Sequence, residues 1–107
     1  MALVTRQKVA SGISASSNYS LSFDILNTFE YSVQVVWTGV DSDSGTFQIS
    51  DSNDGENFNP LVNAQTMACA CTSMKFNFYD SIGYSSLCEY TANNNTAGSF
   101  DIEVVKR

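Results

Sequence analysis

The sequence predicts an all-β protein built as a single antiparallel β-sandwich. Apolar side chains recur at every second position in several short runs, clusters of Ser, Asn and Gly separate those runs, and no segment has a convincing helical period. Ser, Thr and Asn make up 34 of the 107 residues, and these types suit strands and turns better than helices. We therefore expect one domain with seven to eight short strands.

The first twenty residues and the following run open the chain. Residues 1–20 are small and mostly polar, which predicts an extended N-terminal arm or a short edge strand. Residues 21–107 are expected to form the β-sandwich domain. In YSLSFDIL the residues Leu21, Phe23 and Ile25 alternate with polar positions, which is typical of a half-buried strand.

The clearest predicted strand is EYSVQVVWTG. Its inward side chains are expected to be Tyr31, Val33, Val35 and Trp37. A polar loop at residues 39–45 follows, and then TFQIS turns Phe47 and Ile49 inward. We predict that these two runs pair as a β-hairpin.

Further strands are expected in the second half of the chain, at TMACACTS, MKFNFYD, YSSLCEYT and FDIEVV. Turns are predicted at SIG and ANNNTAGS between them. The facing of YSSLCEYT is ambiguous from the pattern alone. In TMACACTS the alternation places Met67, Cys69 and Cys71 on one face, so the cysteines are expected to be buried free thiols. Pairing of Cys88 with Cys69 or Cys71 stays open.

The charge of the chain argues against two classes of partner. Five basic residues stand against eleven acidic ones, for a net charge of −6, and no basic face is visible. We therefore expect no binding to nucleic acid or to an anionic membrane surface. No apolar run approaches the ~20 residues of a membrane span, so no membrane insertion is expected either. MALVTRQKVA lacks the pattern of a signal peptide, so synthesis in a cytoplasm is expected.

Catalytic chemistry is not expected. The chain has no histidine, which removes Ser-His-Asp and Cys-His catalysis, and three cysteines are too few for an all-cysteine zinc site. Pairs of carboxylates occur in polar, turn-rich loops, where nothing is expected to desolvate one and raise its pKa for acid catalysis. We predict that the protein is not an enzyme and has no obligatory cofactor.

Calcium is the metal that the acidic loops favour, because it binds carboxylate and carbonyl oxygens. DSDSGT and DSNDGE both place glycine one position too early for a helix-loop-helix calcium site. A sandwich-loop site remains an alternative, and its candidates are Asp41, Asp43, Asp51 and Asp54. The competing interpretation of SDSNDGENFNP is an ordinary turn in which Gly55 adopts a positive φ.

Aromatic side chains allow one further alternative. Trp37 could form a sugar-stacking platform with tyrosines, namely Tyr31, Tyr84 and Tyr90. The alternation around Trp37 instead predicts that it belongs to the core.

The order of the segments resembles that of small β-sandwich structural proteins of bacteriophages. The similar pieces are VVWTG, GTF, the SNDG turn followed by an aromatic residue, and a late Tyr-Thr strand before a closing strand that glycine introduces; they span roughly residues 30–107. The SNDG turn is also similar to one in discoidin-like sandwiches. This resemblance implies a jelly-roll-like or discoidin-like fold.

The resemblance also implies a function. The expected protein is a non-enzymatic virion component, either capsid-associated or part of a decoration, fibre or connector, made in the host bacterial cytoplasm. Its expected partners are other virion proteins and further copies of itself, on a capsid lattice or in a homo-oligomer. The candidate contact residues are Val40, Ser44, Asn53, Gly55 and Asn57. The alternative is a carbohydrate-binding module for host adsorption, with or without calcium.

Overall fold

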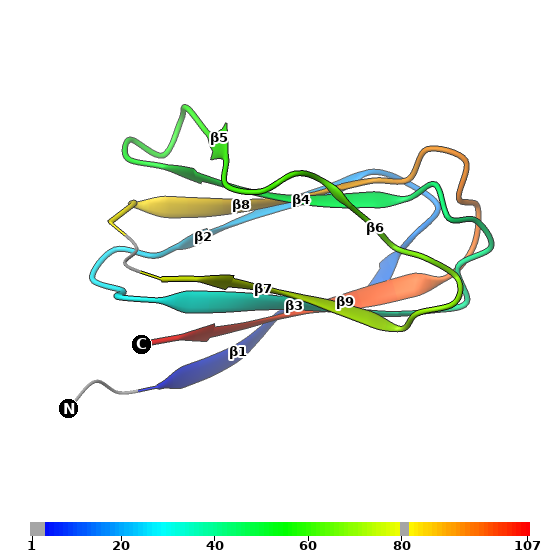
Figure 1. Ribbon diagram of the computed structural model, residues 1–107, viewed down its shortest axis with the longest axis horizontal. Helices are drawn as coiled ribbons and strands as arrows, with labels where there is room; N and C mark the ends of the chain where they lie inside the picture. Colours follow the sequence, from blue (N-terminus) through cyan, green and yellow to red (C-terminus); the bar gives the residue numbers. More distant parts are fainter. Residues whose placement is uncertain (1–3, 80–81) are drawn as a thin grey trace.

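Two antiparallel sheets packed face to face form the whole of the described structure, a computed structural model that covers residues 4–79 and 82–107 (Figure 1). Within those residues the chain forms nine strands and no helix, so no helix there is long and apolar enough to cross a membrane. The predicted all-β sandwich is confirmed, with one strand more than expected. Residues 1–3 of the predicted arm, and Asp80 and Ser81 near the predicted SIG turn, lie outside the described residues.

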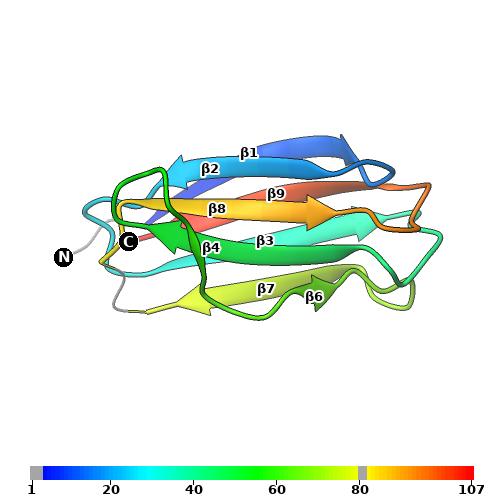
Figure 2. The ribbon, with the colours of Figure 1, turned by 90° about the horizontal axis from the view of Figure 1, so that it is seen from above.

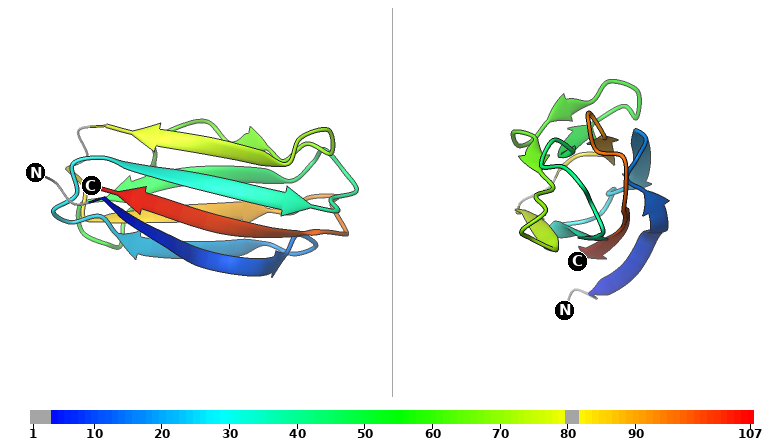
Figure 3. Two further views of the ribbon diagram at one scale, coloured as in Figure 1. Left: turned by 90° about the horizontal axis from the view of Figure 1, so that it is seen from below. Right: turned by 90° about the vertical axis from the view of Figure 1, so that its right-hand side faces the viewer.

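The first sheet has the strand order β1-β9-β3-β7 (Figure 3, left). Its strands are β1 (Thr5–Ser14), β9 (Ser99–Lys106), β3 (Tyr31–Thr38) and β7 (Ser73–Phe78). The register between β1 and β9 shifts twice, between Lys8 and Ala10 and between Ala10 and Ile13. These bulges bend β1, which is an edge strand of the sheet.

The second sheet has the order β2-β8-β4-β5, and β6 also pairs with β4 (Figure 2). Its strands are β2 (Tyr19–Asp24), β8 (Ser85–Thr91), β4 (Thr46–Ser52), β5 (Asn59–Pro60) and β6 (Gln65–Thr66). The two-residue strands β5 and β6 lie along different parts of β4 and together replace one longer strand. This division explains the extra strand.

The chain passes between the sheets at almost every connection. Strands β1, β3, β7 and β9 belong to the first sheet, whereas β2, β4 and β8, which alternate with them in the sequence, belong to the second. This alternation is the jelly-roll arrangement, one of the two expected variants. It also corrects one prediction: β3 and β4 are not a hairpin, because residues 39–45 carry the chain across the roughly 10 Å between the sheets.

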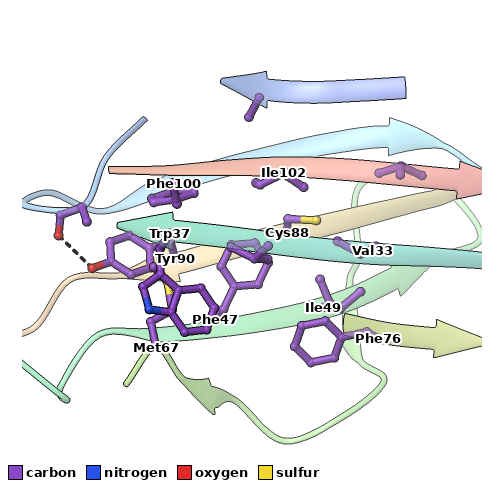
Figure 4. Packing of buried hydrophobic residues seen from close by; sticks show 14 of the residues in the cluster. Val33, Trp37, Phe47, Ile49, Met67, Phe76, Cys88, Tyr90, Phe100 and Ile102 are labelled. Carbon is purple, nitrogen blue, oxygen red and sulfur yellow. Dashed lines mark hydrogen bonds between the residues drawn. The ribbon is translucent and has the colours of Figure 1, made fainter. Parts of the chain in front are cut away.

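The core lies between the sheets and follows the period-two pattern of the strands (Figure 4). Its buried side chains from β3 are Tyr31, Val33, Val35 and Trp37, and those from β9 are Phe100, Ile102 and Val104. From the second sheet come Phe47 and Ile49 of β4 with Cys88 and Tyr90 of β8. The inward faces predicted for β3, β4 and β9 are confirmed, and burial of Ser86, Cys88 and Tyr90 settles the facing of β8.

Candidate interaction surfaces

The two ends of the sandwich differ in how their loops are held. At the Asn95 end, named for its central residue, lie residues 15–18, 39–45 and 92–98. At the terminal end lie residues 25–30 and 53–58, Tyr79 and residues 82–84, together with both ends of the described chain (Figure 1). Strand β4 runs from one end to the other.

A buried asparagine joins three loops at the Asn95 end. The Asn95 side chain is 2% exposed, and its Nδ2 donates to the carbonyls of Ala15 (2.8 Å) and Ala97 (2.7 Å). Its Oδ1 accepts from the backbone N–H groups of Asp41 (3.0 Å) and Ser42 (3.2 Å). Because a buried amide is costly unless its polar atoms are paired, these four bonds hold the loops in one arrangement.

Two of the calcium candidates lie at this end. The Asp41 carboxylate accepts hydrogen bonds from the side chain and the backbone N–H of Thr96, which lower its pKa. The Asp43 carboxylate accepts from the backbone N–H of Cys69 at 2.7 Å, which lowers the pKa of Asp43. Both carboxylates therefore hold neighbouring segments of the chain in place.

The other two candidates lie at the terminal end. Asp54 Oδ1 accepts from Ser52 Oγ (2.8 Å) and from the backbone N–H groups of Glu56 (2.9 Å) and Asn57 (2.8 Å). Its Oδ2 accepts from Asn57 Nδ2 at 2.7 Å, and together these donors hold the pKa of Asp54 well below its usual range. Asp51 lies at the end of β4, beside a polar hollow of about 220 Å³ that Asp54 also lines.

The four aspartates do not form one site. Asp41 and Asp43 precede β4, whereas Asp51 and Asp54 lie at or beyond its far end, and seven strand residues span roughly 20 Å. Within residues 4–79 and 82–107, no three acidic or cysteine side chains are grouped in a way that could hold a metal ion. The alternative of a joint calcium site is therefore not assembled. The carboxylates of Asp41, Asp43 and Asp54 accept hydrogen bonds from neighbouring loops and turns instead.

The turn at SDSNDGENFNP has the local structure that its sequence predicts. Gly55 has a φ of 77°, in the left-handed region that favours glycine. A Cβ at this position would come within 3.1 Å of the Tyr84 ring, so glycine also lets the ring lie close against the turn. The ordinary-turn interpretation is thus confirmed for Gly55.

The aromatic candidates for sugar stacking are mostly inside the protein. Trp37 is 3% exposed and its indole Nε1 donates to the Ala68 carbonyl at 3.0 Å, which confirms its place in the core. Tyr31 and Tyr90 are also buried, and burial raises the pKa of Tyr31 to about 12. Tyr84 is 45% exposed but stands without the other three.

The cysteine prediction is correct for one residue and wrong for two. Cys88 is buried in β8, and burial raises its pKa to about 12. Cys69 and Cys71 are exposed, because β6 ends at Thr66 and the chain then turns instead of continuing as an alternating strand. All three thiols are free.

The contact candidates divide between the two ends. Val40 is half-buried and packs against the core, and Ser44 is half-buried with its Oγ bonded to the backbone N–H of Asn94 (3.0 Å). At the terminal end Asn53 and Asn57 are exposed and Gly55 is half-buried. Exposure therefore favours Asn53 and Asn57 over the other three candidates.

An exposed apolar group at the terminal end was missed by the sequence reasoning. Six of the eight large apolar side chains that are exposed among the described residues lie there: Val4 (61%), Leu26 (55%), Phe29 (74%), Tyr79 (70%), Ile82 (94%) and Tyr84 (45%). The sequence contains a signal for this group, since Ile82 lies in the predicted SIG turn and Phe29 lies between two predicted strands, so neither belongs to an alternating run. We call these six residues the apolar end group.

Two hollows flank the last residues of β7 at this end. One, of about 330 Å³, is lined by Val4, Tyr79 and the ends of β3, β7 and β9. The other, of about 340 Å³, is lined by Tyr79, Ile82 and Leu61, with Asp51 at its edge. Tyr79 lines both hollows, so three members of the apolar end group, Val4, Tyr79 and Ile82, border concave surface.

Comparisons with known proteins do not place the chain in a family. No family model and no curated protein matches it. One similar solved structure is described as "Bacillus endospore appendages form a novel family of disulfide-linked pili"; it is 12% identical, with a TM-score of 0.49, over 96% of this chain and 86% of that chain. Latent PorU from Porphyromonas gingivalis is 14% identical, with a TM-score of 0.38, over 97% of this chain but 12% of its own length. Neither likeness guides function, and the resemblance to bacteriophage proteins stays a prediction.

Proposed function

We propose that this protein is a non-enzymatic structural component that acts by protein–protein assembly, and that the assembly is a bacteriophage virion. The observation that carries the proposal is the apolar end group, which lies beside both ends of the described chain. Large apolar side chains gathered at one place on a soluble domain are typical of an interaction surface.

The energetics favour contact through this group. Fully burying one large apolar side chain contributes about 1.5–3 kcal/mol, so covering even part of the group provides a useful contact. In an assembly of many copies, weak contacts of this size add through high effective concentration. A sandwich whose loops are held together by Asn95 at one end suits such a role, because that end keeps its structure while the opposite end makes contacts.

The virion is the finer part of the proposal. It is supported by the ordered resemblance of residues 30–107 to small phage sandwich proteins and by the jelly-roll topology, which is common in capsid proteins. Other virion proteins are the proposed partners, after synthesis in the host bacterial cytoplasm. No feature of the aspartates or buried aromatics favours the carbohydrate-binding alternative.

The test is incorporation into particles. We expect the wild-type protein in purified phage particles, and we expect Phe29→Ser combined with Ile82→Ser to abolish its incorporation. Val36→Ser is the matched control, because Val36 is 44% exposed on β3 but lies away from the terminal end. Absence of the wild-type protein from particles would overturn the virion proposal, and incorporation of the double variant at the level of the control would overturn the role of the apolar end group.

A further inference from the structure

The outer edges of the two sheets are not equally open to another strand. β1 carries two register shifts and the basic residues Arg6 and Lys8, and β7 has Lys75 near its centre. β5 and β6 are two residues long, and β5 contains Pro60. Bulges, lysines, proline and short length are the features with which sheet edges avoid pairing.

β2 lacks all of these features. Its six residues pair with β8 in one continuous register, from Tyr19 opposite Tyr90 to Asp24 opposite Ser85. Its one charged residue is Asp24, at the very end. β2 is therefore the edge strand with the least protection against pairing.

The backbone groups that face outward from β2 follow from its ladder with β8. The Ile25 N–H donates to the Tyr84 carbonyl at 3.0 Å, in the same register as the strand. Because hydrogen-bonded and non-bonded positions alternate in an antiparallel pair, Tyr19, Leu21 and Phe23 bond to β8, while the N–H and C=O groups of Ser20 and Ser22 point away from it. Ser20 and Ser22 are also exposed.

Side chains along this edge leave the core partly uncovered. Tyr19, Leu21 and Phe23 face inward but are only half-buried, and they pack against the core from its margin. The Tyr19 ring meets Phe100 edge-on at 5.9 Å, and the Phe23 ring meets Tyr31 in the same way at 5.9 Å. A strand added beside β2 would cover the exposed sides of all three.

One contact marks where the open edge stops. Lys106 Nζ donates to the Asp24 carbonyl at 2.9 Å, which occupies the next outward-facing acceptor. The open edge therefore runs from Tyr19 to Phe23. Leu21 is the midpoint of this five-residue stretch.

We propose that β2 pairs antiparallel with β2 of a second copy of this chain, across a two-fold axis at Leu21. In that register Tyr19 faces Phe23 of the second copy, and Ser20 faces Ser22. Aromatic pairs and serine pairs are favourable across antiparallel strands, and no charged side chain enters the ladder. A two-fold contact needs a self-complementary surface, and the sequence YSLSF is one because aromatic, serine, leucine, serine and aromatic residues read the same in both directions.

The proposal joins the second sheets of two copies into one continuous sheet. It concerns a different surface from the apolar end group and does not rest on the proposed function.

Charge substitutions at the two exposed serines test both the pairing and its register. Ser20→Lys with Ser22→Lys would place two introduced lysines opposite each other at both serine pairs, so we expect loss of the dimer. Ser20→Lys with Ser22→Glu would place a lysine opposite a glutamate at the same positions, so we expect the dimer to persist. Sedimentation velocity over a range of concentrations measures the state of each protein, and circular dichroism with thermal melting verifies folding.

Each outcome decides something. A wild-type protein that stays monomeric at every concentration, or a folded lysine–lysine variant that dimerises like the wild type, would overturn the proposal. A folded lysine–glutamate variant that is monomeric would overturn the axis at Leu21. Loss of the dimer in the variant carrying Phe29→Ser and Ile82→Ser, with the β2 variants unaffected, would assign self-association to the apolar end group instead.

Discussion

The Asn95 end and the terminal end of the sandwich differ in how their loops are held and in how much apolar surface they expose. At the Asn95 end a buried side chain makes four hydrogen bonds to three different loops. At the terminal end the Asp54 carboxylate bonds within its own turn, while six large apolar side chains face solvent. The loops of the Asn95 end are joined through one buried side chain. The loops of the terminal end are linked instead by backbone hydrogen bonds, from Ile25 to Tyr84 and from Tyr84 to Ser52, and they carry uncovered apolar surface.

The two ends therefore have different roles: the Asn95 end stabilises the fold, and the terminal end offers surface for contact with a partner. Hydrogen bonds that link distant segments stabilise the fold, since breaking one hub releases several loops at once. Apolar side chains in solvent contribute little to the stability of the fold, but they stabilise a complex when a partner covers them. Substitutions at the Asn95 end should therefore affect unfolding, and substitutions at the terminal end should affect assembly.

The largest effect is expected at Gly98, where the Asn95 end is most tightly packed. Gly98 has a φ of 95°, and a Cβ there would lie 2.7 Å from backbone atoms of Thr38, Gly39 and Val40. We expect Gly98→Ala to lower the free energy of unfolding by about 4 kcal/mol, from backbone strain and overpacking together. Urea denaturation measures this change.

Gly12→Ala is the matched control for Gly98. Gly12 also has a positive φ, 62°, but a Cβ there would meet no atom within 4 Å. The expected loss is about 1 kcal/mol, from the left-handed backbone alone. Equal losses at the two glycines would contradict the close packing at the Asn95 end.

A somewhat smaller effect is expected from removal of the hub itself. Asn95→Ala leaves the N–H groups of Asp41 and Ser42 and the Ala97 carbonyl without their partner, so we expect a loss of about 3 kcal/mol. Asn94→Ala at the neighbouring exposed position should change stability by less than about 0.5 kcal/mol. Equal melting temperatures for the two variants would show that the Asn95 side chain does not hold the loops together.

The Asp54 turn at the terminal end should make the stability of the fold depend on pH in the acidic range. Hydrogen-bond donors lower the pKa of Asp54 in the folded protein, so the ionised carboxylate stabilises the fold at neutral pH. This contribution is complete above the unfolded pKa of about 4 and is lost as the pH falls below it. Thermal melts from pH 7 to pH 2 should therefore show a deficit for Asp54→Ala at pH 7 that shrinks towards pH 2. Glu56→Gln, in the same turn, removes a charge without removing those bonds, and a deficit of the same size there would contradict this account.

The smallest effect on folding is expected in the apolar end group. Phe29→Ser and Ile82→Ser replace side chains that are 74% and 94% exposed, so each should change the free energy of unfolding by less than about 0.5 kcal/mol. Urea denaturation verifies this. A loss above about 2 kcal/mol would show that these residues support the fold and are not reserved for contact.

The sequence predicts which side chains of a strand are buried better than it predicts which strands lie side by side. Alternation identified the buried side of β3, including Trp37, and the positive φ at Gly55 followed from ordinary turn chemistry. The supposed β3–β4 hairpin failed because alternation looks the same whether the next strand lies beside the first or faces it across the core. Exposure of Cys69 and Cys71 was missed because the run TMACACTS alternates although the chain turns there.

The candidate site was harder to predict for the same reason. Four aspartates close in the sequence suggested a joint site, but β4 carries two of them to the opposite end of the sandwich. The role of Asn95 depends on loops from three regions of the chain, which no local pattern relates. The apolar end group likewise gathers residues from positions 4 to 84.

The sequence by itself determined the all-β class and most of the inward-facing residues, because side-chain alternation is a property of each strand alone. The tertiary structure decided which strands pair, which loops meet and which apolar residues stay uncovered. Those outcomes depend on filling one core from both sheets and on pairing buried polar groups across the chain. They emerge only when distant segments are brought together.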